Sequence, residues 1–253
     1  MKKLSVILIG ILLISGHLFS KDQIQADDII KQINDGKSIN YRNVEINGNF
    51  DLTSIKDKEI VKPDQKNSTT VYWYHVRKSI SFIDCIFKGD VIAYFHDDWE
   101  NETHNAVFHD NVVFEGCEFM GKSAFKYSKF YKKANFNKTS FHDEAFFKYA
   151  KFSTDAYFDG SNFRKDANFK YTEFNKIGPF EKSRFQREAN FKYTKFRNGA
   201  NFKNAVFERS ANFKYTKFSE PVYFDDAEFE GDINFKYTKL NGRSYMLHRI
   251  KNK

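Results

Sequence analysis

Residues 189–196 read ANFKYTKF, and close variants of this stretch recur through the second half of the chain. The motif Phe-Lys-Tyr begins at residues 125, 147, 169, 191, 213 and 235, so it returns every 22 residues. A shorter period lies inside it, because central phenylalanines follow one another in alternating steps of five and six residues from Phe108 to Phe235, and the series closes on Leu240. A fixed internal period of this kind is typical of a repeat architecture.

The residue two positions before each central phenylalanine is small in nearly every unit, as in Ala189 before Phe191. A small and a large residue two positions apart lie on the same side of an extended chain. An eleven-residue period can also mark a helical supercoil, but here the apolar positions scatter around a helical wheel and leave no stripe. The pattern therefore predicts short strands joined by corners.

The unit small-x-Phe-x-x resembles the pentapeptide-repeat family, in which Ala, then Asp or Asn, then Leu or Phe precede two variable residues. The sequence ANF, with its asparagine at 135, 168, 190, 201 or 212, carries the resemblance, which covers residues 104–240 closely and 80–95 less regularly. The resemblance implies an all-β fold, a right-handed quadrilateral parallel β-helix (solenoid) with four units per coil. The extra residue in every second unit is expected to widen two corners of each coil.

The domain organisation follows from the ends of this array. Residues 1–20, MKKLSVILIGILLISGHLFS, have the layout of a secretory signal peptide and would anchor the chain in the membrane if uncleaved. Residues 21–40 are expected to form an N-terminal cap helix that starts near Asp27 or Asp28 and ends near Gly36. Residues 41–103 are expected to form irregular first coils with an inserted loop, 104–240 the regular β-helix and 241–253 the C-terminal cap. The expected location is the periplasm, the outer surface or the medium.

The composition agrees with an exported β protein. The chain contains 30 Phe and 14 Tyr, which favour strands, and few Met, Pro or Trp. Without residues 1–20 it keeps 39 basic and 33 acidic residues, a moderate basic excess. Its two cysteines are too few for a disulfide scaffold.

The 22-residue repeat predicts a ladder of tyrosines and lysines on one outer face. Eleven lysines and a single glutamate, Glu173, accompany six tyrosines. The ladder consists of Lys126, Tyr127, Lys148, Tyr149, Lys170, Tyr171, Lys192, Tyr193, Lys214, Tyr215, Lys236 and Tyr237, flanked by Lys129, Lys151, Lys195, Lys217 and Lys239. One interpretation is a surface that binds an anionic polymer, such as an acidic glycan, lipid headgroups or nucleic acid. The other is that the residues shield and solubilise the rod and were copied by repeat duplication.

The polar stretch HDDWENETHNAVFHD, residues 96–110, contains the weak metal-ligand candidates His96, Asp98, His104 and His109. Their spacing matches no established ligand motif, and a solvent-exposed loop has the same composition. The sequence therefore assigns no metal and no cofactor.

Cys85 and Cys117 are expected to lie on the same side of adjacent coils once the insertion is removed. An oxidising compartment favours a disulfide between them. Both also occupy the small inward position of the repeat, which favours two buried free thiols.

No classical catalytic motif is present, although Asp225, Asp226 and Glu228 supply carboxylates. The sequence favours a non-enzymatic exported structural or interaction module of the cell envelope. The alternatives are a binder of anionic polymers and a glycan-active β-helix enzyme. The partner is then a protein or an anionic envelope polymer, and export argues against a natural nucleic-acid partner. DNA mimicry, which the resemblance also suggests, needs an acidic surface, and the resemblance further implies a homodimer through the C-terminal cap.

Overall fold

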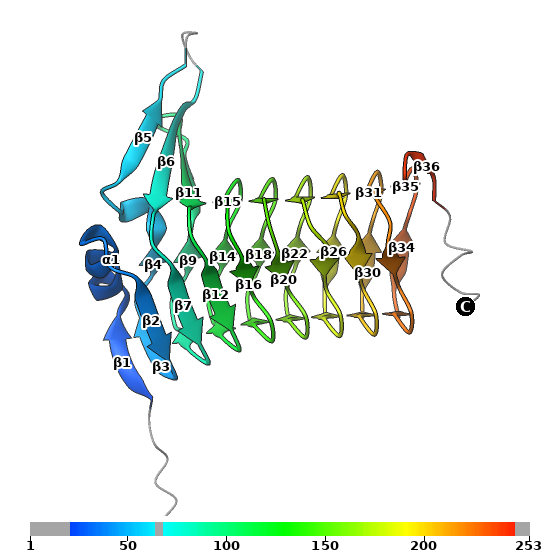
Figure 1. The fold of residues 1–253 in the computed structure, drawn as a ribbon, viewed down its shortest axis with the longest axis horizontal. Helices are drawn as coiled ribbons and strands as arrows, with labels where there is room; N and C mark the ends of the chain where they lie inside the picture. Colours follow the sequence, from blue (N-terminus) through cyan, green and yellow to red (C-terminus); the bar gives the residue numbers. More distant parts are fainter. Residues whose placement is uncertain (1–20, 64–67, 246–253) are drawn as a thin grey trace, which may run out of the picture.

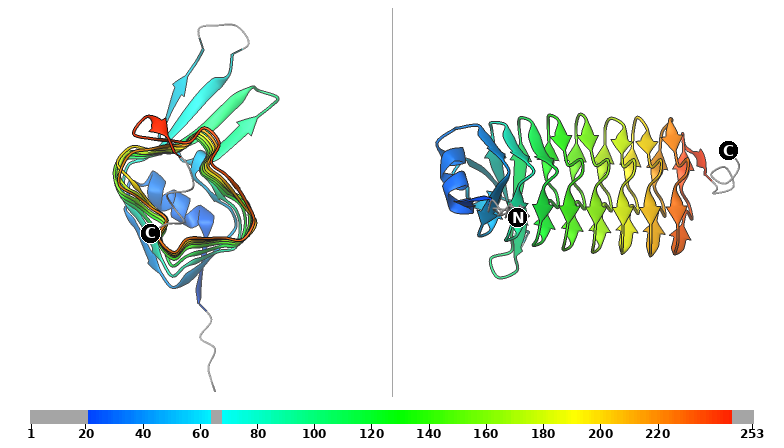
Figure 2. Two further views of the ribbon diagram at one scale, coloured as in Figure 1. Left: turned by 90° about the vertical axis from the view of Figure 1, so that its right-hand side faces the viewer. Right: turned by 90° about the horizontal axis from the view of Figure 1, so that it is seen from below.

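The computed structural model describes residues 21–63 and 68–245, which form a rod of stacked coils with a small sheet projecting from its N-terminal end (Figure 1). The proposed signal peptide and the end of the proposed C-terminal cap lie outside the described residues. Viewed along the rod, the coils superimpose as a four-sided outline (Figure 2). The protein is thus a four-sided parallel β-helix, as the resemblance to the pentapeptide-repeat family implied.

Each side of the rod is a sheet to which successive coils add one short parallel strand. Face 1 contains β1 (Asp22–Gln25), β3 (Val44–Asn47), β8 (Ile86–Phe87), β13 (Glu118–Phe119), β17 (Ser140–Phe141), β21 (Asn162–Phe163), β25 (Arg184–Phe185), β29 (Val206–Phe207) and β33 (Glu228–Phe229). Face 2 contains β4 (Phe50–Asp51), β9 (Val91–Ile92), β14 (Ser123–Ala124), β18 (Ala145–Phe146), β22 (Ala167–Asn168), β26 (Glu188–Asn190), β30 (Ser210–Asn212) and β34 (Asp232–Asn234).

The other two faces are built in the same way. Face 3 contains β15 (Lys129–Phe130), β19 (Lys151–Phe152), β23 (Glu173–Phe174), β27 (Lys195–Phe196), β31 (Lys217–Phe218), β35 (Lys239–Leu240) and the antiparallel β36 (Arg243–Ser244). Face 4, however, is divided into two sheets. The first contains β2 (Ile39–Arg42), β7 (Ile80–Ile83), β12 (Val112–Glu115), β16 (Ala134–Asn135) and β20 (Ala156–Tyr157), and the second contains β24 (Gly178–Pro179), β28 (Ala200–Asn201) and β32 (Val222–Tyr223). Successive central phenylalanines are five residues apart across the corners from face 2 to face 3 and from face 4 to face 1. They are six residues apart across the other two corners.

The interior is filled by columns of phenylalanine. Phe169 stacks on Phe147 and Phe191 of the neighbouring coils at ring-centroid distances of 5.0 and 5.1 Å, and it meets Phe158 of the next face edge-on at 5.4 Å. Both geometries are favourable for aromatic rings. Phe169 and these three neighbouring phenylalanines are fully buried, and so is the small Ala167. The phenylalanines are therefore core residues, as their register predicted.

The N-terminal end is covered by helix α1 (Ala26–Asn34), which buries Ile29 and Ile30 against the first coil. Asp27 and Asp28 lie in its first turn, where carboxylates favour the helix dipole, and Gly36 follows its end with a φ of 72°. The helix is shorter than the segment 21–40, because β1 precedes it and pairs with β3. A short 3₁₀ helix, η1 (Leu52–Ser54), follows β4.

The projecting sheet consists of two hairpins that extend face 3 beyond the rod: β5 (Lys58–Val61) with β6 (Thr70–Val76), and β10 (Tyr94–Asp97) with β11 (Glu102–Phe108) (Figures 1 and 2). Strands β6 and β11 pair in parallel along their full length. The expected irregular loop after Phe95 is therefore wrong, because the insertion is a regular hairpin. Its backbone bonds are made with β6, which lies about thirty residues earlier in the chain.

At the other end, Tyr245 packs its ring against Phe218 and Phe235 of the last coils at 6.0 and 6.3 Å. No helix among the described residues is both long and apolar enough to span a membrane.

Candidate functional site: the lysine and tyrosine strip

The predicted ladder lies on the corner between faces 2 and 3, here called the tyrosine corner. Each Phe-Lys-Tyr-Ser/Thr/Ala stretch is a β-turn closed by a backbone bond, such as Thr194 N–H to the Phe191 carbonyl at 3.0 Å. Its third residue is always tyrosine and always has a positive φ, between 58° and 62°. Turns of this kind normally place Gly or Asn there, because the left-handed conformation costs a side chain with a Cβ about 1 kcal/mol or more.

The polar residues Asn190 and Thr194 of ANFKYTKF each form a specific hydrogen bond. The Asn190 side chain accepts the Lys192 N–H at 3.1 Å and thereby fixes the start of the turn. The Thr194 hydroxyl donates to the Phe169 carbonyl of the preceding coil at 2.7 Å, so this small inward residue also ties two coils together. The same two hydrogen bonds recur 22 residues before and after these positions. They explain why the repeat keeps its asparagine and threonine as well as its apolar residues.

The six tyrosines form one continuous stack. Adjacent rings from Tyr127 to Tyr237 have centroids 4.7–4.9 Å apart, and most are within 2° of parallel. The preceding lysine of each turn places its ammonium nitrogen 5.0–5.3 Å from the ring of its own tyrosine, within the range of a cation–π contact. The result is a flat aromatic row edged with positive charge, here called the Lys/Tyr strip.

A second column of lysines lies beside the strip on face 3 and consists of Lys129, Lys151, Lys195, Lys217 and Lys239. Glu173 interrupts this column, as the sequence indicated. Glu173 forms ion pairs with Lys195 at 2.5 Å and with Arg197 at 3.0 Å, and these cations lower the pKa of its carboxyl although burial opposes them. Burial and the charges of Lys170 and Lys126 lower the pKa of Lys148. The stacked lysines therefore repel one another.

The strip ends at the projecting sheet, which the sequence did not predict. Lys126 donates to the Tyr94 hydroxyl at 2.7 Å and lies 4.3 Å from its ring centre. Lys129 lies 3.6 Å from the ring centre of Trp73. The insertion between Phe95 and Phe108 breaks the 22-residue spacing, so no periodic signal relates Tyr94 or Trp73 to the ladder.

Ten of the eleven lysines in the strip and the second column have no carboxylate partner at ion-pair distance among residues 21–63 and 68–245. Lys126 and Lys129 contact Tyr94 and Trp73 instead, and within the same residues the other eight contact neither a carboxylate nor the projecting sheet. These eight are Lys148, Lys151, Lys170, Lys192, Lys214, Lys217, Lys236 and Lys239. Near the C-terminal end a shallow cleft of about 380 Å³ is lined by Lys195, Arg197, Lys217 and Lys239 with the turn at Asn241 and Gly242. The strip is thus basic, open along its length and closed by aromatic side chains at its N-terminal end.

The metal-ligand candidates of the insertion are not brought together. His96 contacts the Thr103 hydroxyl and Asp98, whereas His104 stacks on Tyr72 and binds the Tyr74 hydroxyl. His109 lies in yet another place, where it shares a 2.8 Å hydrogen bond with His75. No group of three or more metal-binding side chains occurs within the described part of the chain.

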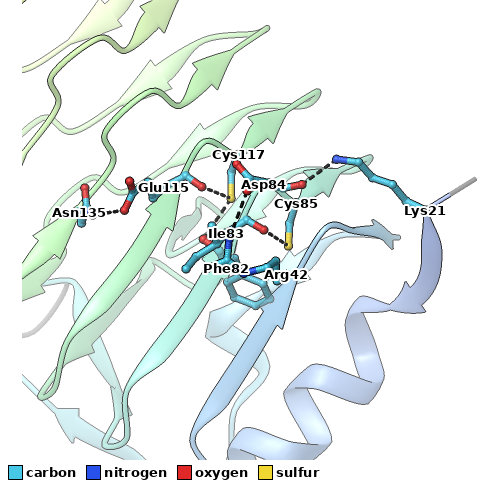
Figure 3. A network of polar contacts seen from close by, with 9 residues as sticks. All are labelled: Lys21, Arg42, Phe82, Ile83, Asp84, Cys85, Glu115, Cys117 and Asn135. Carbon is cyan, nitrogen blue, oxygen red and sulfur yellow. Dashed lines mark hydrogen bonds and ion pairs between the residues drawn. The ribbon is translucent and has the colours of Figure 1, made fainter. Parts of the chain in front are cut away.

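Cys85 and Cys117 lie in adjacent coils and are both buried, with free thiols (Figure 3). The Cys85 thiol donates to the Ile83 carbonyl at 3.3 Å, and the Cys117 thiol donates to the Phe82 carbonyl at 3.4 Å. Burial raises the pKa of Cys117 far above its ordinary value, which disfavours the reactive thiolate. Each thiol therefore fills the small inward position of its unit.

The carboxylates considered for catalysis lie on the corner between faces 4 and 1, here called the opposite corner. Asp225 is 3.7 Å from Lys203 of the previous coil, and Asp226 occupies the turn position with a φ of 54°. Asp226 thus stands where the tyrosine corner has Tyr237.

Comparison with known families agrees with this geometry. Residues 125–173, 147–195 and 191–239 match the family described as pentapeptide repeats (9 copies). Searches among curated proteins and among solved structures each found no match. The family match and the four-sided stack of parallel strands agree, and the chain is therefore a pentapeptide-repeat protein, a structural repeat module.

Proposed function

We propose that this protein is an exported, non-enzymatic binding module of the cell envelope that holds an anionic polymer along the Lys/Tyr strip. The observation that carries the proposal is the tyrosine in the left-handed turn position of six successive coils. The opposite corner has the same turn but contains Gly116, Lys138, Gly160, Lys182, Asn204 and Asp226 there. The fold accepts many residues at this position, so the tyrosines point to a surface role.

The charge of the strip supports an anionic partner. Eight lysines repeat at the strand spacing of about 4.8 Å without carboxylate partners among the described residues. Binding a polyanion replaces their mutual repulsion with attraction and releases counterions, which favours a linear ligand over a single small anion. The parallel tyrosine rings add a platform on which flat or ring-shaped groups stack.

The test uses polygalacturonate, and separately polyphosphate, immobilised on a resin as probes. The variant Lys148→Ser, Lys170→Ser, Lys192→Ser, Lys214→Ser should elute at much lower salt. The slope of log affinity against log salt should fall by about three, at roughly 0.7 for each lost contact. The two probes distinguish a carboxylate polymer from a phosphate polymer.

The matched control removes the same charge elsewhere, in Lys132→Ser, Lys138→Ser, Lys176→Ser, Lys182→Ser. These lysines lie on other corners of the rod, so retention should remain close to that of the parent protein. Equal loss in both quadruple variants would mean that binding follows net charge, and the proposal would fail.

Export has its own test. The residues 1–20 resemble a secretory signal, so the protein isolated from the envelope or the medium should begin near Lys21. Mass spectrometry of the mature N-terminus checks this, and an intact cytoplasmic chain that begins at Met1 would contradict it.

A further inference from the structure

The tip of the β10–β11 hairpin carries the most exposed large apolar side chain of the described residues. The Trp99 side chain is 97% exposed, at the turn between Asp97 and Glu102, which pair across the hairpin. A fully exposed tryptophan leaves a large apolar surface in contact with water, and tryptophan is enriched among the residues that contribute most to binding at protein interfaces. The tip is therefore a candidate contact point.

The tip is held in a defined conformation rather than left as an open loop. The Asp97 carboxylate accepts the backbone N–H groups of Trp99 at 2.8 Å and Glu100 at 3.1 Å. The hairpin beneath it is braced by parallel pairing of β11 with β6. A preorganised tip loses little conformational entropy when it binds.

The same tip is strongly acidic. Asp97, Asp98, Glu100 and Glu102 surround Trp99, and none of the four has a Lys or Arg partner within the described residues. Within the part of the chain that the structure describes, the groups at ion-pair distance are two imidazoles, His96 for Asp98 and His104 for Glu102. An exposed aromatic ring among carboxylates that have no Lys or Arg partner within the described residues is complementary to a surface that is both aromatic and basic.

The Lys/Tyr strip of the same protein has this chemistry, with stacked tyrosine rings edged by eight lysines that lack carboxylate partners among the described residues. Within one molecule the base of the hairpin meets the strip at Tyr94 and Lys126, but its tip does not, because the hairpin projects away from the rod at its N-terminal end (Figures 1 and 2). We propose that the β10–β11 tip of one molecule docks on the Lys/Tyr strip of a second copy, with Trp99 on the tyrosine rings and the acids against the lysines.

This contact joins two different surfaces, so it is heterologous. Repeated head to tail, it extends into a chain; if two molecules exchange tips about a two-fold axis, the two reciprocal contacts together make an isologous dimer. It is separate from the polymer-binding proposal, since it needs the strip to be basic but needs no polymer. A polyanion that binds the strip should compete with it.

Sedimentation velocity over a range of protein concentrations at low salt tests the contact. The parent protein should gain mass with concentration, and added salt should reverse the gain because exposed charges are screened. Trp99→Ala should weaken self-association at least tenfold, while retention on polygalacturonate should not fall, because the strip is intact and no longer competed for by the tip. The matched control Tyr223→Ala removes another exposed aromatic ring and should have no effect.

Two charge variants then locate both halves of the contact. Asp98→Lys, Glu100→Lys should be monomeric, because its tip repels the strip, and Lys192→Glu, Lys214→Glu should be monomeric for the opposite reason. A mixture of the two should associate, since it unites one unchanged strip with one unchanged tip. A parent protein that stays monomeric at every concentration, or a mixture that fails to associate, would overturn the proposal.

A spectroscopic measurement gives an independent outcome. In a Trp73→Phe background Trp99 is the remaining tryptophan, and its emission should shift to shorter wavelength as the protein associates. Association with no change in this emission would place the interface elsewhere and would also overturn the proposal.

Discussion

The tyrosine corner and the opposite corner have the same backbone and different surfaces. In both, a central phenylalanine is followed by a turn whose third residue has a φ between 54° and 66°, and the turn closes with a bond between the same two backbone atoms. Inside, both present Phe and a small residue. Outside, one is a uniform row of tyrosines and the other varies from coil to coil. The comparison separates what the β-helix requires from what it merely permits.

The largest effect should come from the core, where the two corners are equivalent. Phe169→Ala beneath the tyrosine corner and Phe158→Ala beneath the opposite corner each remove a fully buried ring stacked between two others. Each should lower the free energy of unfolding by about 3–5 kcal/mol, measured by urea denaturation. Costs that differ by more than about 2 kcal/mol would show that the two interiors are not equivalent.

The next effect concerns the hydroxyl bonds between coils. Thr194 donates to the Phe169 carbonyl and Ser183 to the Phe158 carbonyl, both at 2.7 Å. Thr194→Val and Ser183→Ala should each cost about 1 kcal/mol, the usual net value of such a bond. The carbonyls keep one backbone bond each, from Thr172 and Ser161, so the cost stays modest.

Ala150 and Ala205 stand at the same positions in other coils and serve as natural controls. Replacing either by Ser should leave stability unchanged or raise it slightly in the same denaturation experiment. A large loss on Thr194→Val, close to that of Phe169→Ala, would mean that the bond holds the coils in register.

The sequence predicted the interior because its information is periodic. Ala189, Phe191 and Phe196 repeat with every unit and fix both the inward side and the register of the strands. The outward ladder was predicted for the same reason, since Lys192 and Tyr193 return every 22 residues.

The features that the sequence could not predict depend on contacts with residues outside the 22-residue repeat. Tyr94 and Trp73 close the strip because two hairpins far apart in the chain pair through β6 and β11. The positive φ of the tyrosines was also hidden, because tyrosine is an unusual residue for that conformation. The position is imposed by the turn, not by the residue that fills it.

A smaller effect should come from exchanging the residues of the two corners. Tyr171→Asn should change the unfolding free energy by less than about 1 kcal/mol, because relief of the left-handed strain offsets the loss of stacking on Tyr149 and Tyr193. Gly160→Tyr should cost about 1 kcal/mol, since it adds the strain without a stacked neighbour. Space is not the cause, because an added Cβ at Gly160 meets no atom closer than 3.6 Å.

Thermal unfolding of both variants checks this exchange. A large destabilisation by Tyr171→Asn would show that the tyrosine stack is a structural support. That outcome would weaken the argument from the tyrosine corner to a binding surface.

The smallest effect concerns repulsion between stacked lysines. Burial and the neighbouring Lys170 and Lys126 lower the pKa of Lys148, so its charged form is less favourable in the folded than in the unfolded protein. Lys148→Gln should therefore stabilise the fold at neutral pH and low salt. We expect about 0.2–0.5 kcal/mol, because most of the repulsion is screened by solvent.

The pH dependence of this effect has a definite sign. With rising pH the folded state loses the Lys148 proton before the unfolded state does, so the parent protein recovers stability as the pH approaches the ordinary pKa of lysine. The advantage of Lys148→Gln should accordingly shrink above about pH 9 and in high salt. Lys182→Gln at the opposite corner is the control, because its neighbours in the column of turn residues are the uncharged Gly160 and Asn204. A gain in stability that does not depend on pH, or an equal gain for Lys182→Gln, would mean that the stacked lysines do not repel one another. Binding of a polyanion would then have no lysine–lysine repulsion to remove.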